Sequence, residues 1–187
     1  DRKQLRREVR RLEALEAKIS ARKLERFSEV YKHIDENFQS TFTELTGGGK
    51  AWLELEKPET VFDGGVSIKA RMPRKRLFPV EALSGGEKSL VSMAFIFAIQ
   101  RYDPSPFYLL DEPDQNLDGV NTEHIGRAIA LQSAVAQFLV VSLHHAALRE
   151  AAHVIGVFMG DDGVSHLHQI HDVDHFIASL PTEEVAA

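Results

Sequence analysis

The stretch LSGGEKSL, Leu83–Leu90, contains two glycines and a Lys-Ser pair, which are the ingredients of a phosphate-binding loop in the wrong order. A true P-loop has the pattern G-x-x-x-x-G-K-[ST], in which backbone N–H groups surround the phosphates and the lysine reaches the outer ones. Here Gly86 is followed by Glu87, and in the stretch GGGKAW Lys50 is followed by Ala51. The printed sequence therefore contains no Walker A motif.

The same stretch has the pattern of a helix start. Ser84 can cap a helix, Glu87 stands three residues later as in a capping box, and an apolar run begins at Leu90. A helix N-terminus carries about half a positive charge and unpaired N–H groups, so it attracts anions. Gly85 and Gly86 would let this backbone approach a phosphate closely. The alternative is a well-capped buried helix that binds nothing.

A second motif, PFYLLDEPD at residues 106–114, predicts a buried strand that ends in two consecutive carboxylates, Asp111 and Glu112. Ligands bind at the carboxyl edge of sheets in α/β proteins, and adjacent residues of a strand point to opposite sides. We expect Asp111 to hold Mg²⁺ through its water shell. Glu112 would face a γ-phosphate and orient or deprotonate the attacking water. The alternative is a strand followed by an acidic turn.

Two further segments follow this pair. Asp118 stands where it can cap the next predicted helix, and the apolar run FLVVSLHH at 138–145 ends in Ser142, His144 and His145. A neutral imidazole there could bond to a γ-phosphate or to the water. A second histidine group spans a strand and a helix without a matching acid, so we do not favour a metal site for it; it comprises His166, His168, His171 and His175.

The flanking sequence predicts an α/β domain behind a long helix. Residues 1–45 contain neither Gly nor Pro and repeat apolar residues every three or four positions. The thin stripe of the first half is typical of a two-helix coiled coil, with a solvated surface helix as the alternative, and toward Phe38 we expect docking on a domain. Two short antiparallel strands follow TGGGKAW, and from residue 83 apolar strands alternate with helices. This order predicts, for residues 46–187, a mostly parallel sheet covered by helices on both faces.

Composition narrows the class of protein. Hydrophobic residues make up 43% of the 187 residues and charged residues 27%, as in soluble globular proteins. There is no cysteine, which excludes disulfides and Cys-type metal sites and is typical of a reducing cytosol. No apolar run reaches the roughly 20 residues of a membrane span, and the charged start has no signal-peptide pattern. The net charge of −6 permits only local basic patches.

In this order, LSGGEKSL, FYLLDEPDQNLD and QFLVVSLHH resemble the C-terminal half of an ABC-type ATPase head. Together with the long helix, FTELTGGGKAWLELEKPE and GVSIKARMP, they resemble the C-terminal head segment of SMC proteins, the chromosome-organising ATPases, over about residues 20–175. In that family the head is split, and Walker A lies in a distant N-terminal half. The resemblance implies that this chain is the returning coil and the C-terminal lobe.

The resemblance also implies roles for single residues. Ser84, Gly85 and Gly86, with Glu87, would form the signature loop that covers ATP bound on a second head. Asp111 would be the Walker B acid, Glu112 the catalytic base, and Asn116, Leu117 and Asp118 the D-loop. The switch residue could be Leu143, His144 or His145, of which we favour His144. Pro113 and Asn116 depart from the usual SMC pattern and resemble the related double-strand-break repair ATPases.

From the resemblance we expect an ATPase that uses ATP and Mg²⁺ and acts in chromosome condensation and segregation. Its partners would be the N-terminal half-head, a second head, DNA, and a kleisin subunit docked at about residues 153–180. The protein would be cytoplasmic and chromosome- or nucleoid-associated. DNA contacts are expected from a basic loop that could equally be only solvated; these residues are Arg71, Arg74, Lys75 and Arg76. The alternatives are a coiled-coil repair ATPase and a non-hydrolysing assembly scaffold.

Overall fold

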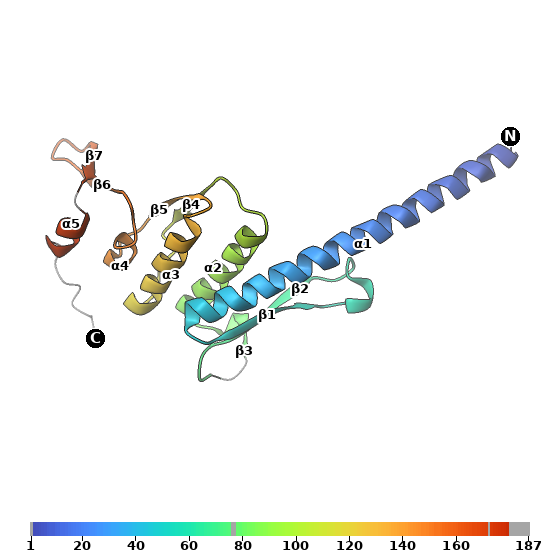
Figure 1. Cartoon of the computed structure of the whole chain (residues 1–187), viewed down its shortest axis with the longest axis horizontal. Coiled ribbons are helices and arrows are strands. Elements are labelled where there is room, and N and C mark those ends of the chain that lie inside the picture. Colours follow the sequence, from blue (N-terminus) through green and yellow to red (C-terminus); the bar gives the residue numbers. More distant parts are fainter. Residues whose placement is uncertain (1, 76–77, 172, 180–187) are drawn as a thin grey trace.

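The computed structural model describes residues 2–75, 78–171 and 173–179. Its first element is a single helix of 45 residues, α1 (Arg2–Thr46), which projects far beyond the rest of the protein (Figure 1). The helix ends where Gly47 and Gly48 adopt φ angles of 64° and 119°, which glycine reaches without the steric cost of a side chain. This confirms the predicted long helix and its end.

The two halves of α1 have different surroundings. Leu5, Leu12 and Ile19 are 62%, 64% and 59% exposed, so none of the described residues buries the thin apolar stripe. Phe38 and Phe42, in contrast, are fully buried, and they join a core cluster with residues from the later helices and strands. The predicted docking of the second half is therefore confirmed, because its broad aromatic face has a partner surface.

A small antiparallel sheet follows α1. It consists of β1 (Lys50–Leu55), β2 (Val66–Arg71) and β3 (Phe78–Pro79), paired in that order, with short 3₁₀ turns at Pro58–Thr60 and Val80–Ala82. Two hydrogen bonds attach α1 to β1: the Tyr31 hydroxyl donates to the Leu53 carbonyl at 2.8 Å, and the Leu53 N–H donates to Asp35 Oδ1 at 2.6 Å. The predicted antiparallel strands are confirmed.

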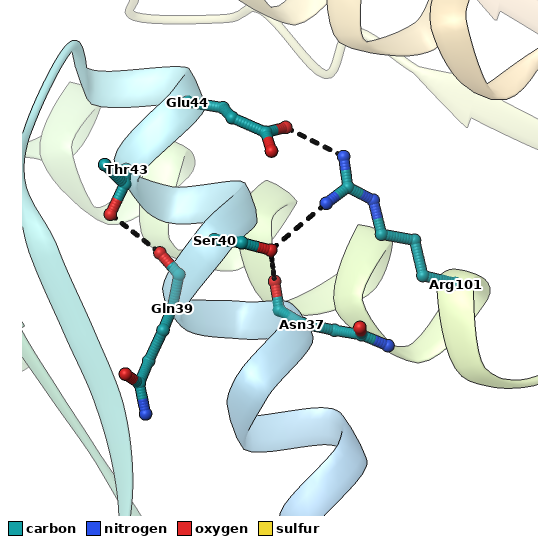
Figure 2. Close-up of polar contacts among 6 residues, drawn as sticks. All are labelled: Asn37, Gln39, Ser40, Thr43, Glu44 and Arg101. Atoms are coloured by element: carbon teal, nitrogen blue, oxygen red, sulfur yellow. Dashed lines mark hydrogen bonds and ion pairs between the residues drawn. The ribbon is translucent and has the colours of Figure 1, made fainter.

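The helix that begins in the opening stretch, α2 (Gly85–Tyr102), lies along the end of α1 (Figure 1). Phe97 of α2 is fully buried, and the Phe38 and Phe95 rings meet edge to face at 5.7 Å. Figure 2 shows the polar side of this contact, where Arg101 reaches Glu44 at 2.8 Å and the Ser40 hydroxyl at 3.3 Å. The far end of α2 is thus tied to the last turns of α1.

Two parallel strands carry the remaining predicted motifs. β4 (Phe107–Asp111) pairs with β5 (Gln137–Val141), and α3 (Gly119–Gln132) connects them. On one face the Tyr108 and Phe138 rings stack at 5.0 Å, and Phe138 packs against the core. On the other face Phe107 and Leu109 are 61% and 70% exposed.

This exposed face corrects one expectation. The sequence predicted buried strands, because an apolar strand in a parallel sheet normally has helices on both sides. Within the described residues only one face of the β4–β5 pair is covered, so β4 alternates between exposed and half-buried residues. The described residues therefore leave one apolar face of the β4–β5 pair exposed.

The C-terminal part contains α4 (His145–Leu148), β6 (Val154–Met159), β7 (Ser165–Ile170) and α5 (Val173–Ser179), all of which were predicted. β6 and β7 form an antiparallel hairpin of their own rather than joining β4 and β5. In Figure 1 this hairpin lies at the opposite end of the molecule from the start of α1. The described strands contain one parallel pair, so a larger parallel sheet stays a prediction.

Candidate functional site

The segment expected to be the signature loop, residues 84–87 and called so below, has the predicted capping box. Ser84 is extended with ψ of 165°, its Oγ accepts from the Glu87 N–H at 3.3 Å, and Glu87 Oε2 accepts from the Ser84 N–H at 2.9 Å. Glu87 Oε1 also pairs with Lys75 Nζ at 2.9 Å. The capping box fixes the N-terminus of α2 at the surface, where Ser84 and Gly85 are both exposed.

The same bonds change the titration of Glu87. Hydrogen bonds from the Ser84 backbone, and then from Lys75, hold the pKa of the Glu87 carboxyl below its ordinary value. Because the folded-state pKa is lowered, this stabilisation is complete above the unfolded-state pKa. It is lost as pH falls through the lowered pKa of the folded state.

The two glycines of the loop have different surroundings. A Cβ at Gly85 would meet nothing within 4 Å, so that side of the loop is open. A Cβ at Gly86 would lie 2.7 Å from the backbone oxygen of Asn116, in the expected D-loop, residues 116–118 and called so below. The signature loop and the D-loop are therefore in direct contact, although about thirty residues separate them in the sequence.

We expect Gly86→Ala to lower the free energy of unfolding by about 1–3 kcal/mol, because an added methyl at 2.7 Å from a backbone oxygen forces one of the loops to move. Gly85→Ala is the matched control, since its methyl enters open space. Chemical denaturation of both variants measures the difference. Equal stability of the two variants would contradict the close contact of the loops.

The carboxylate turn, residues 111–114, leaves the end of β4. Asp111 is the last strand residue and is exposed. Glu112 adopts the left-handed backbone conformation with φ of 45°, and its N–H donates to the Val141 carbonyl at 2.9 Å. A left-handed conformation costs a non-glycine residue about 1–2 kcal/mol. This conformation turns the chain out of the strand direction. The sequence predicted that the strand includes Glu112, but β4 ends at Asp111.

Asp114 was not selected from the sequence, and it is the buried residue of this turn, 2% exposed. Its Oδ2 accepts from the Ser142 hydroxyl at 2.5 Å, and Ser142 Oγ accepts from the His144 N–H at 3.0 Å. The repeated acid in DEPD was the only sequence signal. Acids in turns are ordinarily solvated, so local sequence does not predict the burial.

The D-loop continues from this turn. The Leu117 N–H donates to the Asp114 carbonyl at 3.2 Å, and the Leu117 side chain lies in the core. Asn116 adopts φ of 66°, which asparagine tolerates better than most residues. Asp118 Oδ1 accepts from the Asn121 N–H at 2.8 Å, which confirms the predicted cap of α3.

The histidine loop, residues 142–145, connects β5 to α4. Leu143 is 81% exposed, His144 is the N-cap residue of α4, and both histidines are half-buried. The loop lies beside the carboxylate turn through the Ser142–Asp114 bond. Four segments therefore lie next to one another in the folded chain: the signature loop, the D-loop, the carboxylate turn and the histidine loop.

Comparison with known proteins agrees with this arrangement. Residues 65–166 match the family model described as the RecF/RecN/SMC N terminal domain. The chain belongs to this family. The chromosome partition protein Smc of Pyrococcus furiosus is 43% identical over 139 residues, which are 74% of this chain and 12% of that protein. The Smc protein of Methanocaldococcus jannaschii is 40% identical over 88% of this chain and 14% of its own length. The chain thus spans a small fraction of these relatives.

Solved SMC heads have the same fold. The Smc head domain of Pyrococcus yayanosii with its coiled coil and joint superposes with a TM-score of 0.80 at 39% identity, over 87% of this chain and 32% of that one. A structure from work on ATP-driven dimerization and DNA stimulated activation of SMC ATPases superposes with a TM-score of 0.71 at 40% identity, over 77% of this chain and 87% of that one. The chain is an SMC head segment, as the sequence indicated.

The residues of the basic loop of this SMC segment differ in their contacts. Arg71 ends β2 and is exposed, and Arg74 is exposed with φ of 60°. Lys75 pairs with Glu87, so it supports the signature loop rather than standing free. Arg76 lies outside the described residues. Contact of this loop with DNA stays a prediction.

The site offers some of the groups with which proteins bind nucleotides. The first turn of α2 supplies N–H groups that a helix cannot pair internally, and the open side of Gly85 allows a phosphate to approach them. Asp111 offers the carboxylate oxygens that Mg²⁺ prefers. Among the described residues no group of three or more His, Asp or Glu side chains could hold a metal ion. Likewise, no described helix is long and apolar enough to cross a membrane.

Proposed function

We propose that the chain is the C-terminal half of an SMC ATPase head, in which residues 1–45 are the returning arm of the coiled coil and residues 46–187 the lobe. One observation carries this proposal. The signature loop, D-loop, carboxylate turn and histidine loop are contiguous in space, while the printed sequence has no Walker A motif. A site of this composition needs a phosphate-binding loop from another half-head.

The uncovered strand face supports the same proposal. Phe107 and Leu109 of β4 and Leu139 of β5 are exposed, although apolar parallel strands are ordinarily covered on both faces. We infer that the N-terminal half-head covers this face and completes the sheet. The burial of such a face would supply hydrophobic free energy for the assembly of the two halves.

In the complete head, ATP and Mg²⁺ would supply the phosphoryl group and the cation that neutralises its charge. This chain contributes two sets of groups. The N-terminus of α2, at Ser84 and Gly85, would bind the phosphates of ATP held by a second head and so join the heads. Asp111 would hold the cation through its water shell, while Glu112 would orient the attacking water and accept its proton, with His144 contacting the γ-phosphate.

The same proposal names the partners. SMC heads have been solved with the C-winged helix domain of ScpA, in a structure 42% identical to this chain. We propose that a kleisin of this kind docks on the region 153–180, where Ile155, Val157 and Leu167 of the β6–β7 hairpin are exposed. Arg71 and Arg74 would contact DNA phosphates. A protein of this kind would be chromosome- or nucleoid-associated in the cytoplasm and act in chromosome condensation and segregation.

Reconstitution tests the proposal. We expect ATP hydrolysis only when this chain is combined with the matching N-terminal half, because neither half alone has both the phosphate-binding loop and Glu112. A phosphate-release assay of each half and of the mixture measures this. If this chain alone binds and hydrolyses ATP, the half-site proposal is wrong; if the mixture binds ATP but never hydrolyses it, the scaffold alternative holds.

A further inference from the structure

Asp114 is the least exposed charged residue in the core of the described chain, and its position is unusual for a turn residue. Burial of a carboxylate costs several kcal/mol unless hydrogen bonds replace its water. A solvated turn would fulfil the same local role at no such cost. The buried carboxylate therefore needs a reason beyond the formation of the turn.

The contacts of Asp114 join three segments. Its side chain accepts from the Ser142 hydroxyl at 2.5 Å, in the histidine loop. Its backbone carbonyl accepts from the Leu117 N–H at 3.2 Å, in the D-loop. It also stands two residues after Glu112, so its position restricts the turn that presents the proposed catalytic base.

The Ser142 hydroxyl both donates and accepts a hydrogen bond. A hydroxyl can donate one hydrogen bond while it accepts another. Ser142 donates to Asp114 and accepts from the His144 N–H at 3.0 Å. The two hydrogen bonds thus connect the His144 backbone through Ser142 to Asp114. A hydrogen bond to an ionised carboxylate is stronger than one to a neutral acceptor.

The backbone ladder between β4 and β5 ends before it reaches Asp114 and Ser142. The ladder between β4 and β5 ends with Asp111 opposite Val141, followed by the bond from the Glu112 N–H to the Val141 carbonyl. Beyond that bond the two loops leave the strands and are joined by the side chains of Asp114 and Ser142. The Ser142–Asp114 bond is therefore a side-chain link between the turn that carries Glu112 and the loop that carries His144.

We propose that Asp114 and Ser142 are positioning residues that hold His144 in register with Glu112 for hydrolysis. The proposal rests on the function proposed above for Glu112 and His144. Neither Asp114 nor Ser142 needs to touch the nucleotide. Their effect passes through the histidine loop, which distinguishes them from a pair that merely stabilises the fold.

The test uses Ser142→Ala in the complete head. We expect its turnover number to fall about tenfold, the equivalent of one lost hydrogen bond of about 1.4 kcal/mol, with little change in KM. Ser142→Thr keeps the hydroxyl and should recover turnover to within about threefold of the wild type. Ser133→Ala is the matched control, because it also removes a hydroxyl bond, to the Ala130 carbonyl, but at the exposed end of α3.

A double-mutant cycle separates positioning from stability. If Ser142 acts through His144, Ser142→Ala should change turnover by less than about twofold in a His144→Ala background. Effects that simply multiply would overturn the proposal. So would an unchanged turnover number for Ser142→Ala alone.

Amide hydrogen exchange gives a readout that does not depend on hydrolysis. We expect Ser142→Ala to speed exchange of the His144 amide about tenfold, while the Glu112 amide, bonded to a backbone carbonyl, exchanges as in the wild type. Unchanged exchange at His144 would overturn the proposed chain of bonds. If the wild-type head lacks ATPase activity, the proposed function fails, and exchange alone then decides whether the bonds position the histidine loop.

Discussion

Glu112→Gln is expected to lower ATP turnover by the reconstituted head by at least about 100-fold, the usual contribution of a positioned general base. Glutamine keeps the shape of the side chain but cannot accept the proton of the attacking water. The backbone at Glu112, with φ of 45° and its bond to Val141, does not depend on the carboxylate. ATP binding and ATP-dependent association of heads should therefore persist, with longer-lived dimers.

Phosphate release and light scattering measure the two expected effects on the same samples. Glu123→Gln is a suitable control, because Glu123 lies on the surface of α3, paired with Arg127, outside the four loops of the site. It should hydrolyse ATP at the wild-type rate. Wild-type turnover by Glu112→Gln would remove Glu112 from the role of base and leave the carboxylate turn with a structural role only.

Ser84→Arg is expected to weaken ATP-dependent association of heads by at least about 100-fold, which corresponds to about 2.7 kcal/mol. The side chain of Ser84 stands at the exposed N-terminus of α2. An arginine there would fill the space in front of the helix and add positive charge to its positive end. Nucleotide binding by the matching N-terminal half should be unchanged, since its own phosphate-binding loop is intact.

The capping role of Ser84 requires a control for stability. Loss of an N-cap costs about 1 kcal/mol, so Ser84→Arg should unfold at a somewhat lower denaturant concentration. Ser84→Asn keeps the cap and adds little volume, so it should retain both stability and most of the association. Dimerisation of Ser84→Arg at the wild-type affinity, measured by analytical ultracentrifugation with ATP, would show that this loop does not face a second head.

Much of the fold follows from local sequence. The absence of Gly and Pro before Gly47 predicts α1, and Ser84 with Glu87 predicts the start of α2. Asp118 predicts the cap of α3. These features depend on residues three or four positions apart, whose interactions are the same in almost any tertiary setting.

The position of the two carboxylates at the end of a strand was also predictable, because Asp111 and Glu112 directly follow an apolar run. The geometry of the carboxylate turn was not. The left-handed conformation of Glu112 and the contact of Gly86 with Asn116 depend on how β4, β5 and α2 come together. No local pattern encodes such contacts.

Local sequence predicts most of the helices and strands and the polar groups at their ends. The burial of Asp114 against Ser142, the pairing of β6 with β7 and the exposure of one face of β4 follow only from the folded arrangement. Such features cannot be predicted locally, because burial depends on partners distant in the chain. Ser142 follows Asp114 by 28 residues, and periodicity carries no information about contacts at that separation.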